Sequence, residues 1–333
     1  MTKIYLIRHA EAEGNVFRRL QGQYDSFVTP NGRKQIEALK KRFESIHVDA
    51  VFASDLTRTR CTAGAIYKPK GLELKTDKRF REMSVGIWEN LPFGWLDHSD
   101  PERNHDFSHN PETWHVENSE RFEEYTARFL QALDEIAASH EGKTVVIVSH
   151  GMVLRGILQK MFYPNDRKAV AHCENTAVTH LTYENGSYRL EYLNDASHIT
   201  PEISTLGRQM WWRGDGKKDF NMWYCAPTGD DKPLLQILGF APEETHTVRI
   251  SVLGGVKTGV VALEGNELKF LGLLEEHRGI GLSAQLLGEA VSIARSQGFE
   301  TLRITQAVMH PAAQRLFKNY GFVDGVMPII PHL

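Results

Sequence analysis

The chain has 333 residues, and at about 150 residues per domain this length predicts two domains. Hydrophobic residues make up 41% of the chain and charged residues 24%, a balance that excludes a disordered or collagen-like protein. The formal net charge is only −3, which argues against a broad nucleic-acid-binding surface. No apolar stretch approaches the roughly 18 residues that a membrane-spanning helix needs, so we expect neither nucleic acid nor a membrane as a partner.

Cysteine usage and the start of the chain favour a cytoplasmic protein. Cys61, Cys173 and Cys225 are widely spaced and odd in number, so we interpret them as reduced thiols rather than disulfides or a zinc site. The apolar run before Arg8 has four residues, which is too short for a signal peptide.

The first half of the chain alternates strand and helix patterns, which predicts an α/β fold with a mostly parallel sheet. The Asn185-Gly186 pair predicts a tight turn between the last two strands of this half. The predicted strands are residues 3–7, 50–53, 143–148, 176–181 and 188–193, and the predicted helices are 29–43, 121–138 and 153–162.

The amino-acid composition changes at residues 199–232, where Trp211, Trp212 and Trp223 stand among Gly, Asp and Lys residues. Disordered tails rarely contain so many tryptophans, so we interpret this stretch as a connector with aromatic anchors. Beyond it, the predicted strands are residues 247–252, 259–263, 268–274 and 301–305, and the predicted helices are 281–296 and 312–320. The expected domains are therefore 1–198 and 233–333.

Basic and imidazole side chains follow three predicted strands of the first half. Arg8 and His9 come directly after the first strand, His150 follows residues 143–148, and Arg58 follows residues 50–53. Ligands of open α/β sheets bind beyond the carboxyl ends of the strands, so these side chains can meet at one sheet edge. Two arginines and two histidines together predict a phosphoryl-binding pocket.

Five segments in one order extend this pattern: LIRHAEAEGN, LQGQYDSFVTPNGRKQ, SDLTRTRCTA, FREMSVGIWEN and VVIVSHG. With the later LNDASHI, they make residues 3–198 resemble the histidine phosphatase superfamily, also called phosphoglycerate mutase-like. The resemblance implies a three-layer α/β domain with a mostly parallel sheet.

The same resemblance implies roles for individual residues. His9 is expected to be the nucleophile and to form a phosphohistidine without a metal ion. Glu82 is expected to protonate the leaving oxygen and then to activate water. The expected phosphoryl-stabilising groups are Arg8, Arg58, Asn15 and a protonated His150, and the expected substrate-side residues are Gln21 and Gly22.

Residues 88–120 are expected to form a cap over the pocket. The histidines and aspartates in this stretch fit no standard zinc spacing, so we interpret it as a solvated cap loop and expect no metal. After Glu82 the chain reads MSVGIWENLPFG, which is similar to phosphatase members and favours hydrolysis of a small phosphomonoester. A phosphoglycerate-type phosphomutase stays open as the alternative.

The second half carries LKFLGLLEEHRGIGLSAQLL, then AVSIARSQGFETLRI and HPAAQRLFKNYGFV. Glycines between a strand and a helix let backbone N–H groups approach a phosphate. The three segments resemble the GNAT superfamily of N-acetyltransferases, which implies an α+β domain and acetyl-CoA as cosubstrate. The residues expected to contact acetyl-CoA are Leu273, Leu274, Arg278, Gly279, Ile280, Gly281 and Leu282.

Several positions depart from the GNAT pattern. Glu276 stands where Gln or Arg is usual, His310 stands where Asn is frequent, and Phe317 replaces a tyrosine that protonates the leaving thiolate in many members. Tyr320 lies three residues farther along the same predicted helix. Two readings of this half stay open, an active N-acetyltransferase and a non-catalytic regulatory module.

Overall fold

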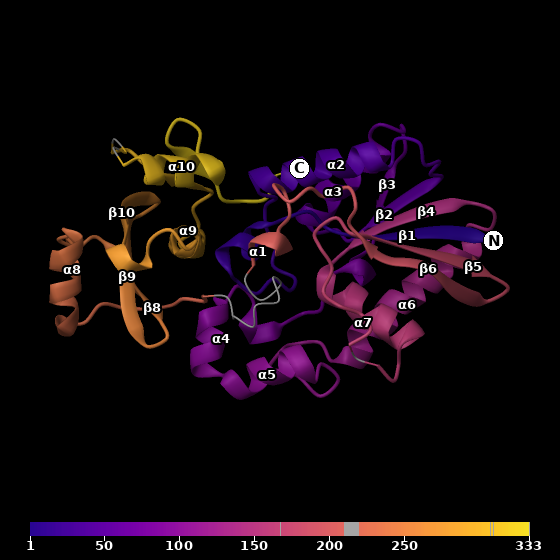
Figure 1. Cartoon of the computed structure of the whole chain (residues 1–333), viewed down its shortest axis with the longest axis horizontal. Coiled ribbons are helices and arrows are strands. Elements are labelled where there is room, and N and C mark those ends of the chain that lie inside the picture. The colour runs from indigo at the N-terminus through magenta and orange to yellow at the C-terminus, as the bar shows by residue number, and fades with distance from the viewer. Residues whose placement is uncertain (167, 210–219, 307, 309, 333) are drawn as a thin grey trace.

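The computed structural model describes residues 1–166, 168–209, 220–306, 308 and 310–332, which contain two six-stranded sheets (Figure 1). Four neighbouring strands of the first sheet run parallel, and its last two strands run antiparallel. In spatial order the first sheet contains β3 (Leu74–Thr76), β2 (Ala50–Ala53), β4 (Thr144–Ser149), β1 (Thr2–Arg8), β5 (Val178–Glu184) and β6 (Ser187–Asp195).

Helices cover both faces of the first sheet, which gives the three expected layers. Helices α2 (Pro30–Arg42) and α3 (Thr57–Tyr67) pack on one face, and α6 (Phe122–Ser139) and α7 (Gly151–Phe162) pack on the other (Figure 1). The predicted α/β class with a mostly parallel sheet is confirmed. Helix α2 begins where predicted because Thr29 Oγ1 accepts the N–H of Gly32 at 2.9 Å.

The cap over the first domain is not the solvated loop that we predicted from residues 88–120. It contains helices α4 (Phe93–Ser99) and α5 (Pro101–His109), and it is packed around buried aromatic rings. The Trp88 ring lies 5.3 Å from Trp114, and Phe107 lies 4.8 Å from Trp114, centroid to centroid. These three rings are part of the same buried hydrophobic cluster as the core of the first domain, so the cap is a packed extension of that domain.

The second sheet is antiparallel except where β10 meets β11, with one helix on one face and two helices on the other. In spatial order it contains β12 (Val326–Pro328), β11 (Thr301–Arg303), β10 (Glu267–Leu273), β9 (Val256–Glu264), β8 (Thr247–Leu253) and β7 (Trp223–Cys225). The helices are α8 (Lys232–Leu238), α9 (Leu282–Ser296) and α10 (Pro311–Asn319). The predicted α+β class of this half is confirmed.

The stretch 199–232, which we interpreted as a connector, contributes a strand to the second sheet. This strand is β7, in which Trp223 pairs with Val252. Trp211 and Trp212, the other two expected anchors, lie outside the described residues.

Short 3-10 helices complete the described secondary structure. They are η1 (Lys78–Phe80), η2 (Gly86–Trp88), η3 (Leu206–Arg208), η4 (Gly229–Asp231) and η5 (Glu275–His277). Within the described residues, no helix combines the length and apolar character that crossing a membrane requires.

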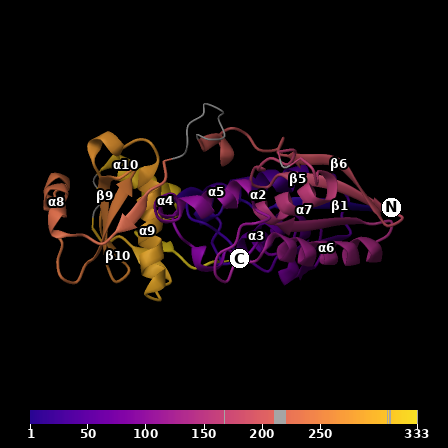
Figure 2. The ribbon, with the colours of Figure 1, turned by 90° about the horizontal axis from the view of Figure 1, so that it is seen from below.

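The two domains contact each other through α1 (Glu13–Phe17) and α9, and Figure 2 shows α9 between the second sheet and the first domain. Phe17 packs directly on Gly288, where an added Cβ would lie 2.4 Å from the Phe17 Cβ. Two ion pairs flank this contact. Arg295 donates to Glu13 at 2.7 and 2.8 Å, and Arg19 donates to Glu289 at 2.8 Å. Helix α1, which follows His9 closely in the chain, therefore joins the first domain to the second.

Candidate active site of the first domain

The carboxyl ends of β1 and β4 bring His9 and His150 together. The two strands are parallel with Arg8 opposite Ser149, so the residues that follow them emerge at the same edge. The His9 and His150 rings lie 5.3 Å apart, centroid to centroid, and both side chains are buried.

The hydrogen bonding of His9 fixes which ring nitrogen is free. Its Nδ1 lies 2.7 Å from the carbonyl oxygen of Ala10, and because a carbonyl only accepts, Nδ1 carries the proton. In the neutral ring Nε2 then keeps its lone pair. Burial lowers the pKa of His9 well below its usual value, and the charges of Arg58 and Arg8 add to this effect. His9 is therefore a neutral imidazole with an available nucleophilic nitrogen.

The interaction between Arg58 and His150 orients the second ring. Arg58 is completely buried on α3, and its Nε donates to His150 Nδ1 at 3.2 Å. In the neutral ring the proton of His150 therefore sits on Nε2. Burial lowers the pKa of His150 well below its usual value, and Arg58 and His9 lower it further. The expectation of a protonated His150 is wrong for this state of the site, because a positive ring would face Arg58 at hydrogen-bond distance.

Two buried N–H groups at this edge have no hydrogen-bond partner among the described residues: Arg8 Nε and His150 Nε2. Arg8 is held in place by its Nη1, which donates to the Cys173 carbonyl at 2.5 Å. Buried donors are normally satisfied, so two such groups beside one nucleophile are suited to an anion.

The side chain of Glu82 reaches the N-terminus of α7. Its carboxylate accepts the N–H of Val153 at 2.7 Å, of Met152 at 2.9 Å and of Met83 at 3.0 Å. Burial raises the pKa of Glu82, and these three hydrogen bonds partly oppose the rise because they favour the charged form. Glu82 lines the same cavity as Arg8 and His9, as expected for a proton donor and acceptor.

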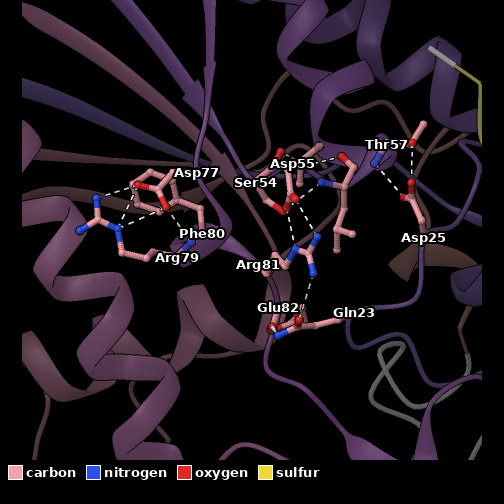
Figure 3. Close-up of polar contacts among 12 residues, drawn as sticks. Gln23, Asp25, Ser54, Asp55, Thr57, Asp77, Arg79, Phe80, Arg81 and Glu82 are labelled. Atoms are coloured by element: carbon pink, nitrogen blue, oxygen red, sulfur yellow. Dashed lines mark hydrogen bonds and ion pairs between the residues drawn. The ribbon is translucent and has the colours of Figure 1, made fainter.

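The segment before Glu82 is fixed by polar contacts that sequence reasoning missed. Figure 3 shows Arg81 pairing with Asp55, with both N–O distances at 2.6 Å. Arg128 of α6 donates to the Glu82 carbonyl at 2.8 Å. Figure 3 also shows Asp25 accepting from Thr57, the first residue of α3, which fixes the helix that carries Arg58. These pairs join distant segments, so nothing in the local sequence signals them.

The three expected substrate residues differ in their positions. Asn15 and Gln21 line the cavity. Gly22 does not line it, because its carbonyl accepts from Arg58 at 2.7 Å and its N–H donates to Glu89 at 3.2 Å. A Cβ at Gly22 would lie 2.2 Å from the Glu89 carboxylate, so this glycine allows a close approach that supports Arg58.

The cavity around His9 has a volume of about 1440 Å³. The cap helices α4 and α5 form much of its wall. Among the described residues, no group of three or more His, Cys, Asp or Glu side chains is arranged to hold a metal ion.

In the second domain, the loop before α9 contains the glycines that the GNAT resemblance singled out. Gly279 and Gly281 have φ angles of 79° and 88°, and a Cβ added at either would meet no atom within 4 Å. Arg278 Nε donates to the Leu273 carbonyl at 2.9 Å, which ties the loop to the end of β10. Ile280 is exposed, whereas Leu282 is buried as the first residue of α9, so Leu282 can offer a ligand only its backbone.

At the position where many GNAT members have the proton-donating tyrosine this chain has Phe317, and Tyr320 follows at the C-terminal end of α10. Phe317 is buried and packs on Phe322 with ring centroids 5.1 Å apart. Tyr320 packs on Phe17 of the first domain at 5.6 Å, and burial raises its pKa to about 12. The Tyr320 ring is therefore part of the domain contact.

Comparisons with known proteins agree with the family resemblance that we described for each half of the chain. Residues 4–196, more than half of the chain, match the histidine phosphatase superfamily (branch 1). The chain belongs to this superfamily. Residues 209–322 match the acetyltransferase (GNAT) family, so this member of the histidine phosphatase superfamily carries a GNAT domain in the same chain.

Individual relatives match the phosphatase half along their whole length. The chain is 30% identical over 215 residues to a probable phosphoglycerate mutase of Serratia proteamaculans, a match that covers 62% of this chain and 100% of the relative. Among solved structures, Bacillus stearothermophilus YhfR is 32% identical with a TM-score of 0.58, covering 60% of this chain and 100% of its own. A mycobacterial glucosyl-3-phosphoglycerate phosphatase complexed with VO3 is 25% identical with a TM-score of 0.54, covering 58% of this chain and 99% of its own.

Proposed function

We propose that the first domain hydrolyses a small phosphomonoester without a metal ion, through a phosphohistidine on His9. The observation that carries this proposal is the free Nε2 of His9 beside two unpartnered buried donors, with Glu82 in the same cavity. A nucleophile, an anion site and a proton donor are the groups that two-step phosphoryl transfer requires.

In the first step, His9 Nε2 attacks phosphorus and the ester P–O bond breaks. Glu82 gives its proton to the leaving alcohol, while Arg8 and the Nε2–H of His150 stabilise the phosphoryl oxygens. In the second step, Glu82 takes a proton from water as the water oxygen attacks phosphorus. The N–P bond breaks, and phosphate and neutral His9 are formed.

The alternative is a phosphomutase, because the curated relatives are named probable phosphoglycerate mutases. The phosphatase-like MSVGIWENLPFG segment and the similarity to a phosphatase of known structure favour hydrolysis. A phosphate-release assay on a panel of phosphomonoesters, with His9→Ala as control, tests the proposal. Conversion of 3-phosphoglycerate to 2-phosphoglycerate without phosphate release would favour the mutase.

We also propose that the second domain binds an acyl-CoA at the loop before α9. The pyrophosphate would lie on the backbone N–H groups from Arg278 to Leu282, and the pantetheine arm beside Leu273 and Leu274. Strands β10 and β11 pair only at Glu267 and Arg303, which supports an opening between them for that arm. When bound, acetyl-CoA supplies a thioester whose acetyl group an amine can accept.

Two residues of the second domain bear on acyl transfer. Phe317 has no proton to give and Tyr320 packs in the domain contact, and both facts favour a binding module over an N-acetyltransferase. Calorimetry with acetyl-CoA, followed by an amine-acceptor screen, separates the two readings. Turnover of any acceptor would support the acetyltransferase.

A further inference from the structure

The wall of the phosphatase cavity is not built by the first domain alone. Trp223 of β7 lines the cavity, and so do Leu253, Gly254 and Gly255 at the turn between β8 and β9. All four residues belong to the second sheet or its turn. The cavity that contains His9 is therefore shared by the two domains.

Specific contacts hold this wall against cap helix α4, which lies beside the second domain (Figure 1). The rings of His98 and Trp223 are stacked, with centroids 4.0 Å apart and planes 6° apart. Asn221 accepts from Arg18 at 3.0 Å and donates to Asp97 at 3.2 Å. At Gly94 an added Cβ would lie 2.4 Å from the Met222 backbone, so the chain leading to β7 packs closely on α4.

The size of the cavity bears on the substrate. Small-molecule pockets usually measure about 300–1,000 Å³, and this one measures about 1440 Å³. A three-carbon phosphoglycerate bound at His9 would leave most of that space empty. The wall that the cap and the second domain contribute mixes apolar Phe93, Trp223 and Leu253 with polar Asp97 and Asn104.

We propose that the second domain forms a specificity subsite of the phosphatase, at which Trp223 and Leu253 contact the alcohol part of the substrate. The substrate class is a phosphomonoester whose alcohol is extended, with an apolar or ring portion and hydrogen-bonding groups. This inference rests on the proposed phosphatase function and adds the identity of the leaving-group site.

The experiment compares two esters, 4-methylumbelliferyl phosphate as the extended probe and glycerol 3-phosphate as the compact one. Trp223→Ala is expected to lower kcat/KM for the extended ester about tenfold, mainly through KM, and to change the compact ester less than twofold. Each variant is compared with the wild type on the same ester, so differences in leaving-group reactivity cancel. Phe240→Ala is the matched control, because it removes an aromatic ring of the same domain that does not line the cavity.

Leu253→Trp adds bulk to the same wall and serves as the second variant if Trp223→Ala fails to fold. It is expected to exclude the extended ester selectively. Equal losses on both esters, or no loss on either, would overturn the inference, as would a wild type that hydrolyses only the compact ester. A wild type that releases phosphate from neither ester would overturn the proposed phosphatase function, and the inference with it.

Discussion

The Nε of Arg58 lies 3.2 Å from the Nδ1 of His150, and both side chains are completely buried. Because Nδ1 accepts this hydrogen bond, the proton of the neutral His150 ring lies on Nε2. The proposed mechanism uses this Nε2–H of His150 for a phosphoryl oxygen, while the other nitrogens of Arg58 donate to the carbonyls of Gly22 and Tyr24.

Arg58→Lys is expected to lower kcat for phosphate release about 100-fold, a loss typical of a site that loses one stabilising donor. An ammonium group cannot donate in the directions of the guanidinium fork. Nitrogen-15 NMR of the histidines should then show a mixed tautomer at His150. Arg60→Lys on the same helix is the control, and a single retained Nε2–H tautomer in Arg58→Lys would contradict the role given to Arg58.

The pH dependence follows from the directions of two pKa shifts. His9 attacks only when neutral, and its pKa lies well below 6.5, so activity is lost only as the pH falls through that lowered value. Glu82 donates a proton only when protonated, and burial raises its pKa, so kcat/KM is lost as the pH rises through that raised value.

Glu82→Gln should remove the alkaline limb of this profile and lower kcat/KM about 100-fold or more for an ester of a poor leaving group. The loss should be smaller for 4-methylumbelliferyl phosphate, whose leaving group needs less protonation. Glu123→Gln, at an exposed position, should leave the profile unchanged. If the alkaline limb persisted in Glu82→Gln, the titration of another group would be its cause.

Much of the first domain was predictable because its signals are local. The β-branched run at residues 143–148 and the apolar run at residues 3–7 gave strands β4 and β1 nearly residue for residue. Their parallel pairing then follows from the order of elements, and it brings His9 next to His150 as the sequence predicted. The catalytic roles of these residues stay predictions.

The features that sequence reasoning missed depend on distant partners. Helix α7 begins at Gly151, two residues earlier than predicted, where the Glu82 carboxylate accepts the N–H groups of Met152 and Val153. We predicted a solvated loop for the cap because its sequence is rich in histidines and aspartates. The aromatic rings that pack together in the structure are not neighbours in the sequence, so no local pattern indicated their contact. Strand β7 spans three residues, too few to show any periodicity.

The domain contact predicts a large loss of stability in Arg295→Ala. Glu13 is buried, with 3% of its side chain exposed, and Arg295 pairs with both of its oxygens. Removing the arginine leaves a buried carboxylate without its countercharge, at a cost of about 3 kcal/mol in the free energy of unfolding. Urea unfolding of the wild type and of Arg295→Ala measures this cost.

A second substitution separates the effect of the Arg295–Glu13 ion pair on stability from the effect of packing. Burial already raises the pKa of Glu13, so the loss in Arg295→Ala should shrink as the pH falls and the carboxyl group becomes neutral. Adding Glu13→Gln should recover part of the loss. A double variant that is no more stable than Arg295→Ala would show that the charge of Glu13 is not the cause.

The acyl-CoA proposal predicts that Gly281→Ala weakens acetyl-CoA binding at least tenfold. The added Cβ would strain a residue at φ 88° and fill space that the pyrophosphate would occupy. Gly298→Ala is a matched control, because Gly298 has φ 84° and open space but lies beyond the other end of α9. Calorimetry should show normal binding in the control, and equal weakening in both variants would assign the effect to strain alone.

In the proposed mechanism His9 carries the phosphoryl group during turnover, and trapping this acid-sensitive phosphohistidine is the decisive measurement. The wild type is mixed with 4-methylumbelliferyl phosphate, quenched in base within milliseconds and digested for mass spectrometry. We expect the mass of one phosphoryl group on the peptide containing His9, absent from His9→Ala and lost after acid treatment. Turnover by the wild type with no modified His9 peptide, or undiminished phosphate release by His9→Ala, would contradict this mechanism.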